Sequence, residues 1–125
     1  MFQIASYETF RDGQIIFKEG SNGDWIYVVE EGEVEISKNV DGQRIVFETL
    51  KETNIFGEMA YIDKAPRSAT ATAKGTTVVG IIDRSVFDAE FNKLSADFQK
   101  ILKMVAFRLR KTTERSVDAQ DEKGD

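Results

Sequence analysis

The chain has 125 residues, of which 41% are hydrophobic and 31% are charged, and its net charge is −5 at neutral pH. This length fits one globular domain, and the negative charge argues against a general nucleic-acid or membrane-surface binder, because both partners are anionic. Cysteine and histidine are both absent, which excludes disulfides, His-containing catalytic triads and most transition-metal sites, so we expect no metal and no cofactor.

Short strands separated by turn signals fill the chain from Tyr7 to Asp83. The Asp41-Gly42 pair favours a type I′ hairpin, because both central residues of that turn need positive φ. Regular short strands with such turns predict an antiparallel barrel or sandwich. The predicted strands are "QIIFKEG" (14–20), "WIYVVEEG" (25–32), "EVEISKNV" (33–40), "RIVFETL" (44–50) and "TTVVGIID" (76–83).

The pattern becomes helical after residue 83. Asp83 or Ser85 can cap a first helix within 83–94, and Ser95 can cap a longer helix over 96–115. Met104 and Phe107 lie outside the apolar stripe of the second helix, and they indicate either an extra surface for a ligand or subunit, or the edge of a broad core contact. The stripe itself consists of Phe98, Ile101, Leu102, Val105 and Leu109.

The chemistry concentrates in "FGEMAYIDKAPRSATATA", residues 56–73. Gly57 allows a close backbone approach, and a short helix starting at Glu58 would present unpaired amides that suit a phosphate. Pro66, the only proline, stiffens the exit from that helix. Arg67 then supplies a forked guanidinium that can hold two phosphate oxygens at once.

The neighbouring residues complete a pocket. Ser68 and Ala69 are small enough to let a ligand lie close, and the Ser68 hydroxyl can donate to a phosphate oxygen or to a base edge. Glu58 is a hydrogen-bond acceptor, so it cannot bind a phosphate, but it can accept a hydrogen bond from a sugar hydroxyl. Taken singly, each residue is explained by a solvated loop or a helix start, whereas together they describe a pocket for one phosphate, one ribose and an apolar base.

The same stretch resembles the phosphate-binding cassette of the cyclic nucleotide-binding domain family. That family includes catabolite activator proteins, regulatory subunits of cyclic-nucleotide-dependent kinases, and cyclic-nucleotide-gated channels. The pattern F-G-E-M-A, a variable spacer, and P-R-S-A-T is matched without a gap, and "DGQIIFKEGSNGDWIYVVEEGEVEI" (12–36) resembles the glycine-punctuated strands of the family. The resemblance covers roughly residues 7–115.

The resemblance implies the fold and the site. The fold is mainly β, an eight-stranded antiparallel jelly-roll-like β-roll with a short helix in the cassette and two C-terminal helices. We expect this domain to span residues 1–115, and the small, polar and acidic composition of residues 116–125 predicts a disordered tail. Arg67 would pair with the cyclic phosphate, Glu58 would accept from the ribose 2′-hydroxyl, and backbone amides would line the phosphate at Gly57, Met59, Ala60, Ser68 and Ala69. The base-capping candidates on the last helix are Phe107, Arg108 and Arg110.

The expected function is a non-catalytic, cytoplasmic sensor that binds cAMP or cGMP and signals by moving its C-terminal helix. Ser68 does not settle the choice of base, and we favour cAMP. The expected partners are the nucleotide and a second copy of the chain or an effector protein at that helix, with no nucleic acid and no membrane. The alternative is a structural or docking β-roll whose cassette no longer binds nucleotide. An enzyme such as a phosphodiesterase is disfavoured because no His, Cys or two-metal acidic cluster is present.

Overall fold

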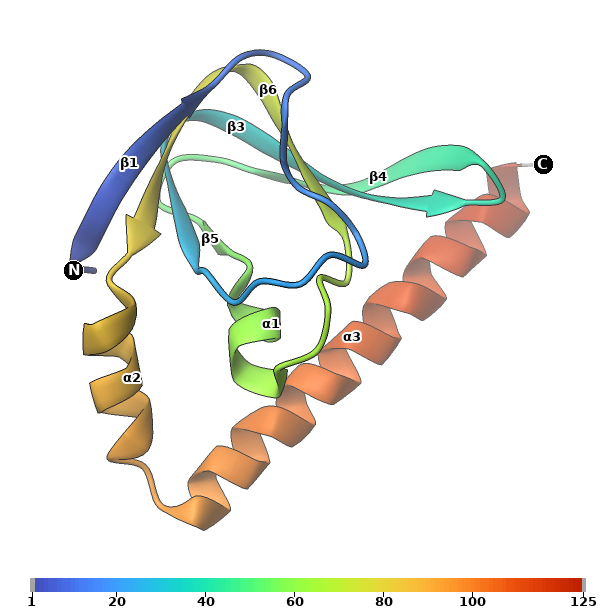
Figure 1. Ribbon diagram of the computed structural model, residues 1–125. Helices are drawn as coiled ribbons and strands as arrows, with labels where there is room; N and C mark the ends of the chain where they lie inside the picture. The colour runs from blue at the N-terminus through green and yellow to red at the C-terminus, as the bar shows by residue number, and fades with distance from the viewer. Residues whose placement is uncertain (1, 125) are drawn as a thin grey trace.

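One curled antiparallel sheet carries a short helix at its open side and two helices at its C-terminal end (Figure 1). The computed structural model describes residues 2–124, with side chains described as far as residue 112. In these residues the elements are β1 (Ile4–Phe10), β2 (Ile15–Phe17), β3 (Tyr27–Val40), β4 (Gln43–Leu50), β5 (Ile55–Phe56), α1 (Glu58–Asp63), β6 (Thr70–Ile82), α2 (Arg84–Asn92) and α3 (Ala96–Gly124).

The mainly β architecture with a cassette helix and two C-terminal helices is confirmed, although the described residues form six strands where eight are expected. The strand order is β1-β6-β3-β4, with β2 pairing with β6 and β5 with β3. The predicted strands 25–32 and 33–40 merge into the single strand β3, which bends through register shifts between Val29 and Glu33. Likewise, β6 begins in the small residues at the end of the cassette and continues into the predicted strand 76–83. A β-bulge bends a strand without ending it, so two predicted strands joined by a bulge form one strand in the structure.

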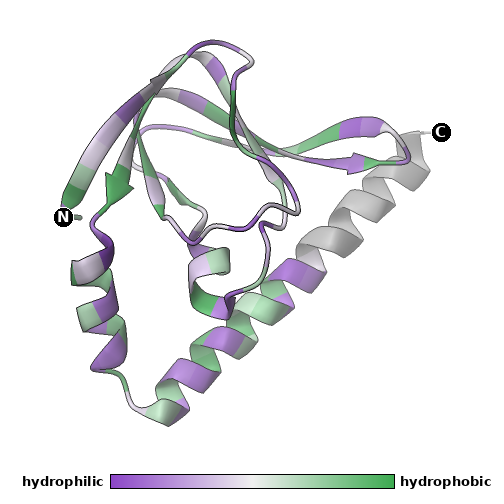
Figure 2. Cartoon of the chain, viewed as in Figure 1, coloured by the Kyte–Doolittle hydropathy of each residue, from purple (hydrophilic) through white to green (hydrophobic). Residues whose placement is uncertain are grey.

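The interior of the roll is a cluster of aliphatic and aromatic side chains. Val29, Val34 and Val79 are at most 1% exposed, and Tyr27 stacks on Phe56 with ring centroids 5.1 Å apart. Figure 2 shows hydrophobic colour at the end of β6 that leads into α2. A second cluster links that end to the helices, because Ile26, Ile82 and Tyr61 of α1 pack with residues of α2.

The three predicted turn and cap signals are confirmed. Asp41 and Gly42 both have positive φ, 53° and 80°, in the turn between β3 and β4. The Asp83 carboxylate accepts from the Ser85 amide at the start of α2, and the Ser95 hydroxyl accepts from the Phe98 amide at the start of α3. These signals act over short stretches of sequence. A capping side chain accepts a hydrogen bond from an amide two or three residues away, and the turn needs only two residues with positive φ.

Helix α3 runs from the end of α2 past α1 toward the β3–β4 hairpin (Figure 1). Its bounds include most of residues 116–125, but side chains from 113 onward lie outside the described residues, so the disordered tail stays a prediction. Of the predicted stripe, Leu102 is half-buried, while Phe98, Ile101, Val105 and Leu109 are each about half exposed. None of the described helices is long and apolar enough to cross a membrane.

Gly32 of β3 provides a test of how closely β3 and its antiparallel neighbour β6 pack at their register shift. A Cβ on Gly32 (φ +85°) would lie 2.5 Å from the Thr76 carbonyl oxygen, whereas one on Gly42 (φ +80°) would meet nothing within 4 Å. We expect Gly42→Ala to lower the free energy of unfolding by about 1–2 kcal/mol, the cost of the left-handed backbone. Gly32→Ala should lose about 1–3 kcal/mol more because its methyl group also overpacks the contact with Thr76 of β6. Urea denaturation of both variants measures the difference, and equal losses would contradict a close contact between β3 and β6 at Gly32.

Candidate phosphate-binding cassette

Gly57 is required by a close contact as well as by its backbone conformation. It caps the start of α1 with φ 84° and ψ 2°, in the left-handed region. A Cβ at this position would lie 2.7 Å from Arg67 Nη1 and 2.9 Å from the Trp25 carbonyl oxygen. Both distances are shorter than van der Waals contact, so only glycine lets α1 begin beside the guanidinium.

Arg67 is buried, with only 4% of its surface exposed. Its Nη1 donates to the Gly57 carbonyl and its Nη2 to the Trp25 carbonyl, both at 2.9 Å. The Phe17 ring lies under the guanidinium, with 4.3 Å between Cζ and the ring centroid. Burial lowers the pKa of Arg67 from its ordinary value because it removes water from the charged form. An arginine fixed in this way is a preorganised positive charge.

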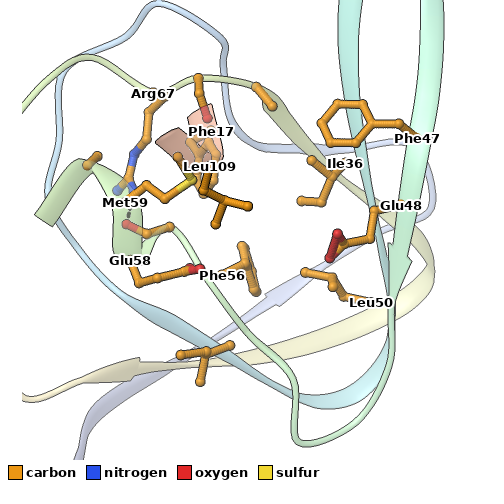
Figure 3. Close-up of a pocket in the computed structure, with 15 residues that line it drawn as sticks. Phe17, Ile36, Phe47, Glu48, Leu50, Phe56, Glu58, Met59, Arg67 and Leu109 are labelled. Atoms are coloured by element: carbon orange, nitrogen blue, oxygen red, sulfur yellow. Dashed lines mark hydrogen bonds between the residues drawn. The ribbon is translucent and has the colours of Figure 1, made fainter. Parts of the chain in front are cut away.

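A cavity opens beside Arg67, between α1, the strands and α3 (Figure 3). All seven residues that the sequence predicts for the cassette line it, namely Gly57, Glu58, Met59, Ala60, Arg67, Ser68 and Ala69. Figure 3 shows Arg67, Glu58 and Met59 on one side and Ile36, Phe47, Glu48 and Leu50 on the other. The arrangement can hold an anion at one end and a flat apolar group at the other.

Sequence reasoning missed several of the lining residues. Phe17 of β2 and Glu48 of β4 line the cavity, and so does Leu109 of α3. Glu48 stands two residues before buried Leu50 in β4, so the alternation of the strand could have placed it inside. No local signal marks Phe17, because its role depends on where β2 meets the cassette.

Glu58 is half-buried at the first position of α1. Burial raises the pKa of Glu58, and the nearby negative charge of Glu48 adds to this, while its own backbone hydrogen bond and the Arg67 charge oppose it. The carboxylate is therefore held in an environment that disfavours its charge. A hydroxyl donor would compensate it, which fits an acceptor for a sugar hydroxyl.

None of the three predicted base-capping residues is among those that line the cavity. Phe107 is 57% exposed, with Lys111 Nζ 5.6 Å from its ring centroid, and Arg108 is exposed. Leu109 lines the cavity instead. Each residue of an α-helix is rotated by about 100° from the one before it, so Arg108 and Phe107 are rotated by about 100° and 200° from Leu109. Capping by the three candidates stays a prediction.

Arg110 makes the principal polar contact between α3 and the cassette loop. Its Nε and Nη2 donate to the Asp63 carboxylate at 2.8–3.0 Å, and its Nη1 donates to the Pro66 carbonyl at 2.8 Å. The Arg110 and Asp63 side chains are 13% and 14% exposed. This paired, largely buried contact fastens α3 to the end of α1 and to the residue before Arg67.

Among the described residues, no group of three or more acidic side chains lies close enough together to hold a metal ion. The cavity offers instead one buried cation, backbone amides, an acceptor in Glu58 and an apolar wall. These groups suit an organic anion with a sugar and a flat ring.

The family model described as the cyclic nucleotide-binding domain matches residues 7–93. The chain belongs to the cyclic nucleotide-binding domain family. The matched residues include all of the cassette, so the resemblance of the Phe-Gly-Glu and Pro-Arg-Ser motifs is confirmed at the level of the family.

Several known proteins are similar to part of this chain. A cGMP-dependent protein kinase of Toxoplasma gondii is 39% identical over 70% of the chain, which corresponds to 8% of the kinase. A cAMP-dependent protein kinase regulatory subunit of Mucor circinelloides is 35% identical over 62% of the chain and 18% of the subunit. The chain thus spans less than a fifth of either relative.

A solved structure, the EAL enzyme Bd1971 in its cAMP-bound form, aligns with a TM-score of 0.81 and 31% identity. The alignment covers 94% of this chain and 31% of that one. Its cGMP-bound form aligns with a TM-score of 0.77 and 32% identity over 84% of this chain and 28% of that one. The similarity therefore extends beyond the cassette to almost the whole chain.

The raised pKa of Glu58 gives a prediction in which stability and binding move in opposite directions. A carboxyl whose pKa is raised on folding binds protons more readily in the folded state, so stability falls as pH rises through the folded pKa. We expect Glu58→Gln to raise Tm at pH 7 and to reduce the pH dependence of Tm between pH 4 and 7. If Glu58 accepts from the ligand, nucleotide affinity should fall about 10- to 100-fold, as for a hydrogen bond to a charged group.

Thermal melts across pH and calorimetric titration check both halves of that prediction. Glu52→Gln, in the exposed loop after β4, is the control for removing one negative charge. A lower Tm for Glu58→Gln at pH 7 would contradict the argument that Glu58 is destabilised by its environment.

Proposed function

We propose that this chain is a non-catalytic sensor module that binds cAMP, or cGMP, in the cassette cavity. Arg67 pairs with the cyclic phosphate, and Glu58 accepts from the ribose 2′-hydroxyl. Amides at Gly57, Met59, Ala60, Ser68 and Ala69 complete the phosphate site. The observation that carries the proposal is the buried Arg67 guanidinium, which is held by two backbone carbonyls and the Phe17 ring. Arg67 lines the same cavity as the other six predicted cassette residues.

The choice of a cyclic purine nucleotide is supported by the solved relative, whose structures carry cAMP in one form and cGMP in another. A net charge of −5 would repel any anion at long range. Local geometry at Arg67 therefore has to supply the attraction, and a buried, hydrogen-bonded cation supplies it most strongly at short distance. Catalysis is not part of the proposal, and the cytoplasmic location stays a prediction.

The proposed signal passes through α3. Leu109 lines the cavity and Arg110, the next residue, binds Asp63 and the Pro66 carbonyl. A ligand that touches Leu109 and orders the loop before Arg67 would favour the position of α3 in which both contacts exist. The nucleotide then shifts a population of α3 positions because its affinity differs between them.

The direct test is calorimetric titration of stripped protein with cAMP, cGMP and AMP. We expect one-to-one binding of a cyclic nucleotide and much weaker binding of AMP, whose open phosphate does not match the site. Arg67→Ala should lose about 2–5 kcal/mol of binding, or roughly 30- to 4,000-fold, because one side of a buried charge pair is removed. Arg44→Ala, which removes an exposed cation from the β4 surface, is the control. Unchanged affinity in folded Arg67→Ala would exclude the phosphate assignment.

A double-mutant cycle tests whether α3 is coupled to the cassette. We expect Arg110→Gln and Asp63→Asn each to lower the free energy of unfolding by about 1.5–3 kcal/mol, and each to weaken nucleotide binding. The double variant should lose little more than either single one, because the two changes remove the same contact. Lys103→Gln, an exposed cation on α3, controls for charge. Additive losses in the free energy of unfolding, together with unchanged nucleotide affinity, would show that the position of α3 is not coupled to nucleotide binding.

The alternative is a structural or docking β-roll that acts through α3, with a second copy of the chain or an effector protein as its partner. The exposed apolar residues of this helix favour it, since Phe98, Ile101, Met104, Val105 and Phe107 are between 46% and 57% exposed. A Tm that ignores nucleotide but rises with protein concentration would support this function over the sensor. Intact nucleotide after long incubation would exclude a phosphodiesterase.

A further inference from the structure

Glu48 places a carboxylate on the inner face of strand β4. The register pairs Leu50 with Val34 and Glu48 with Ile36 across the β3–β4 ladder. Val34 and Leu50 are buried, and Ile36 packs against the same core. Because side chains two apart on a strand share a face, Glu48 lies on the cavity side of β4 with Leu50, although Glu48 itself is exposed.

The inner carboxylate is not explained by an ion pair. Figure 3 shows Glu48 on the cavity side opposite Arg67 and Glu58, next to Ile36 and Leu50. Among the side chains described through residue 112, no hydrogen bond or salt bridge involves Glu48. Its charge is instead repelled by Glu58 across the same cavity. Glu48 is exposed and lines the cavity, so its carboxylate is an acceptor on a mainly apolar wall that a ligand carrying a donor can reach.

We propose that Glu48 is a specificity-determining residue that selects adenine by accepting a hydrogen bond from its 6-amino group. This inference rests on the proposed function. With the phosphate at Arg67 and the ribose at Glu58, the base extends to the side of the cavity formed by Ile36, Phe47, Glu48 and Leu50. Glu48 is the charged group on that side, and the surrounding apolar wall suits the faces of a purine.

The chemistry of position 6 gives the direction of the selectivity. Adenine carries an amino donor there, whereas guanine and hypoxanthine carry a carbonyl acceptor. An ionised carboxylate only accepts hydrogen bonds, so it attracts the first group and repels the second. The preference for adenine therefore requires Glu48 to face position 6 itself, because the neighbouring N1–H of guanine and hypoxanthine and the 2-amino group of guanine are donors that a carboxylate would also attract.

The test compares cAMP, cIMP and cGMP by calorimetry on the full chain and on Glu48→Ala and Glu48→Gln. The base of cIMP carries the 6-carbonyl and the N1–H of guanine without its 2-amino group, so it removes the 2-amino group from the comparison with cAMP. We expect wild-type protein to bind cAMP about 10- to 100-fold more tightly than cIMP, the range for one hydrogen bond to a charged group. In Glu48→Ala this preference should disappear, mainly through weaker cAMP binding. Glu52→Gln should keep it.

Three outcomes would overturn the inference. An equal cAMP-to-cIMP ratio in wild type and Glu48→Ala would show that Glu48 does not read the base. A wild-type preference for cGMP that is lost in Glu48→Ala would mean that the carboxylate reads the adjacent N1–H and 2-amino donors of guanine. Failure of wild-type protein to bind any of the three would overturn the proposed function together with this inference. A merely structural Glu48 would instead lower Tm in both variants, whereas we expect both to keep the wild-type Tm because the Glu48 side chain is exposed.

Discussion

The burial of Arg67 is the constraint on which the site depends. A guanidinium leaves water only if its donors are satisfied and its charge is compensated. Here the Gly57 and Trp25 carbonyls accept two of its hydrogen bonds, and Phe17 covers one face. These partners come from the start of α1, the segment before β3, and β2. The curvature of the sheet brings these three segments together around the Arg67 side chain. Gly57 is fixed in turn, because any larger residue would displace the guanidinium.

The same cavity holds one charge that does not favour an empty protein. Burial raises the pKa of Glu58, and the negative charge of Glu48 on the opposite wall adds to this. The Glu58 carboxylate therefore costs stability in the absence of a ligand and is compensated when a donor arrives. Binding sites commonly retain polar groups in unfavourable environments. A group whose hydrogen bonds are already satisfied within the protein has no capacity left to bind a ligand.

The link from this site to the rest of the molecule is short. Leu109 and Arg110 are consecutive in α3, and one lines the cavity while the other binds Asp63 at the end of α1. In the proposed function, a ligand that shifts Leu109 would also change the geometry at Arg110, because a helix is stiff over one turn. The exposed apolar side chains of α3 lie on this same element. The proposed ligand contact and the exposed apolar surface therefore belong to one helix.

The sequence by itself determined the features that are satisfied locally. The hairpin at Asp41-Gly42, the caps at Asp83 and Ser95, the start of α1 at Glu58, and the gathering of the cassette residues all follow from short-range patterns. Only the tertiary structure decided which residues hold Arg67 and Arg110, since Trp25 lies 42 positions from Arg67 and Asp63 lies 47 from Arg110. It also merged predicted strands into β3 and β6 and placed Leu109 in the cavity rather than Phe107. Local conformational preference specifies turns and caps, whereas long-range partners depend on how the bent strands bring distant segments together.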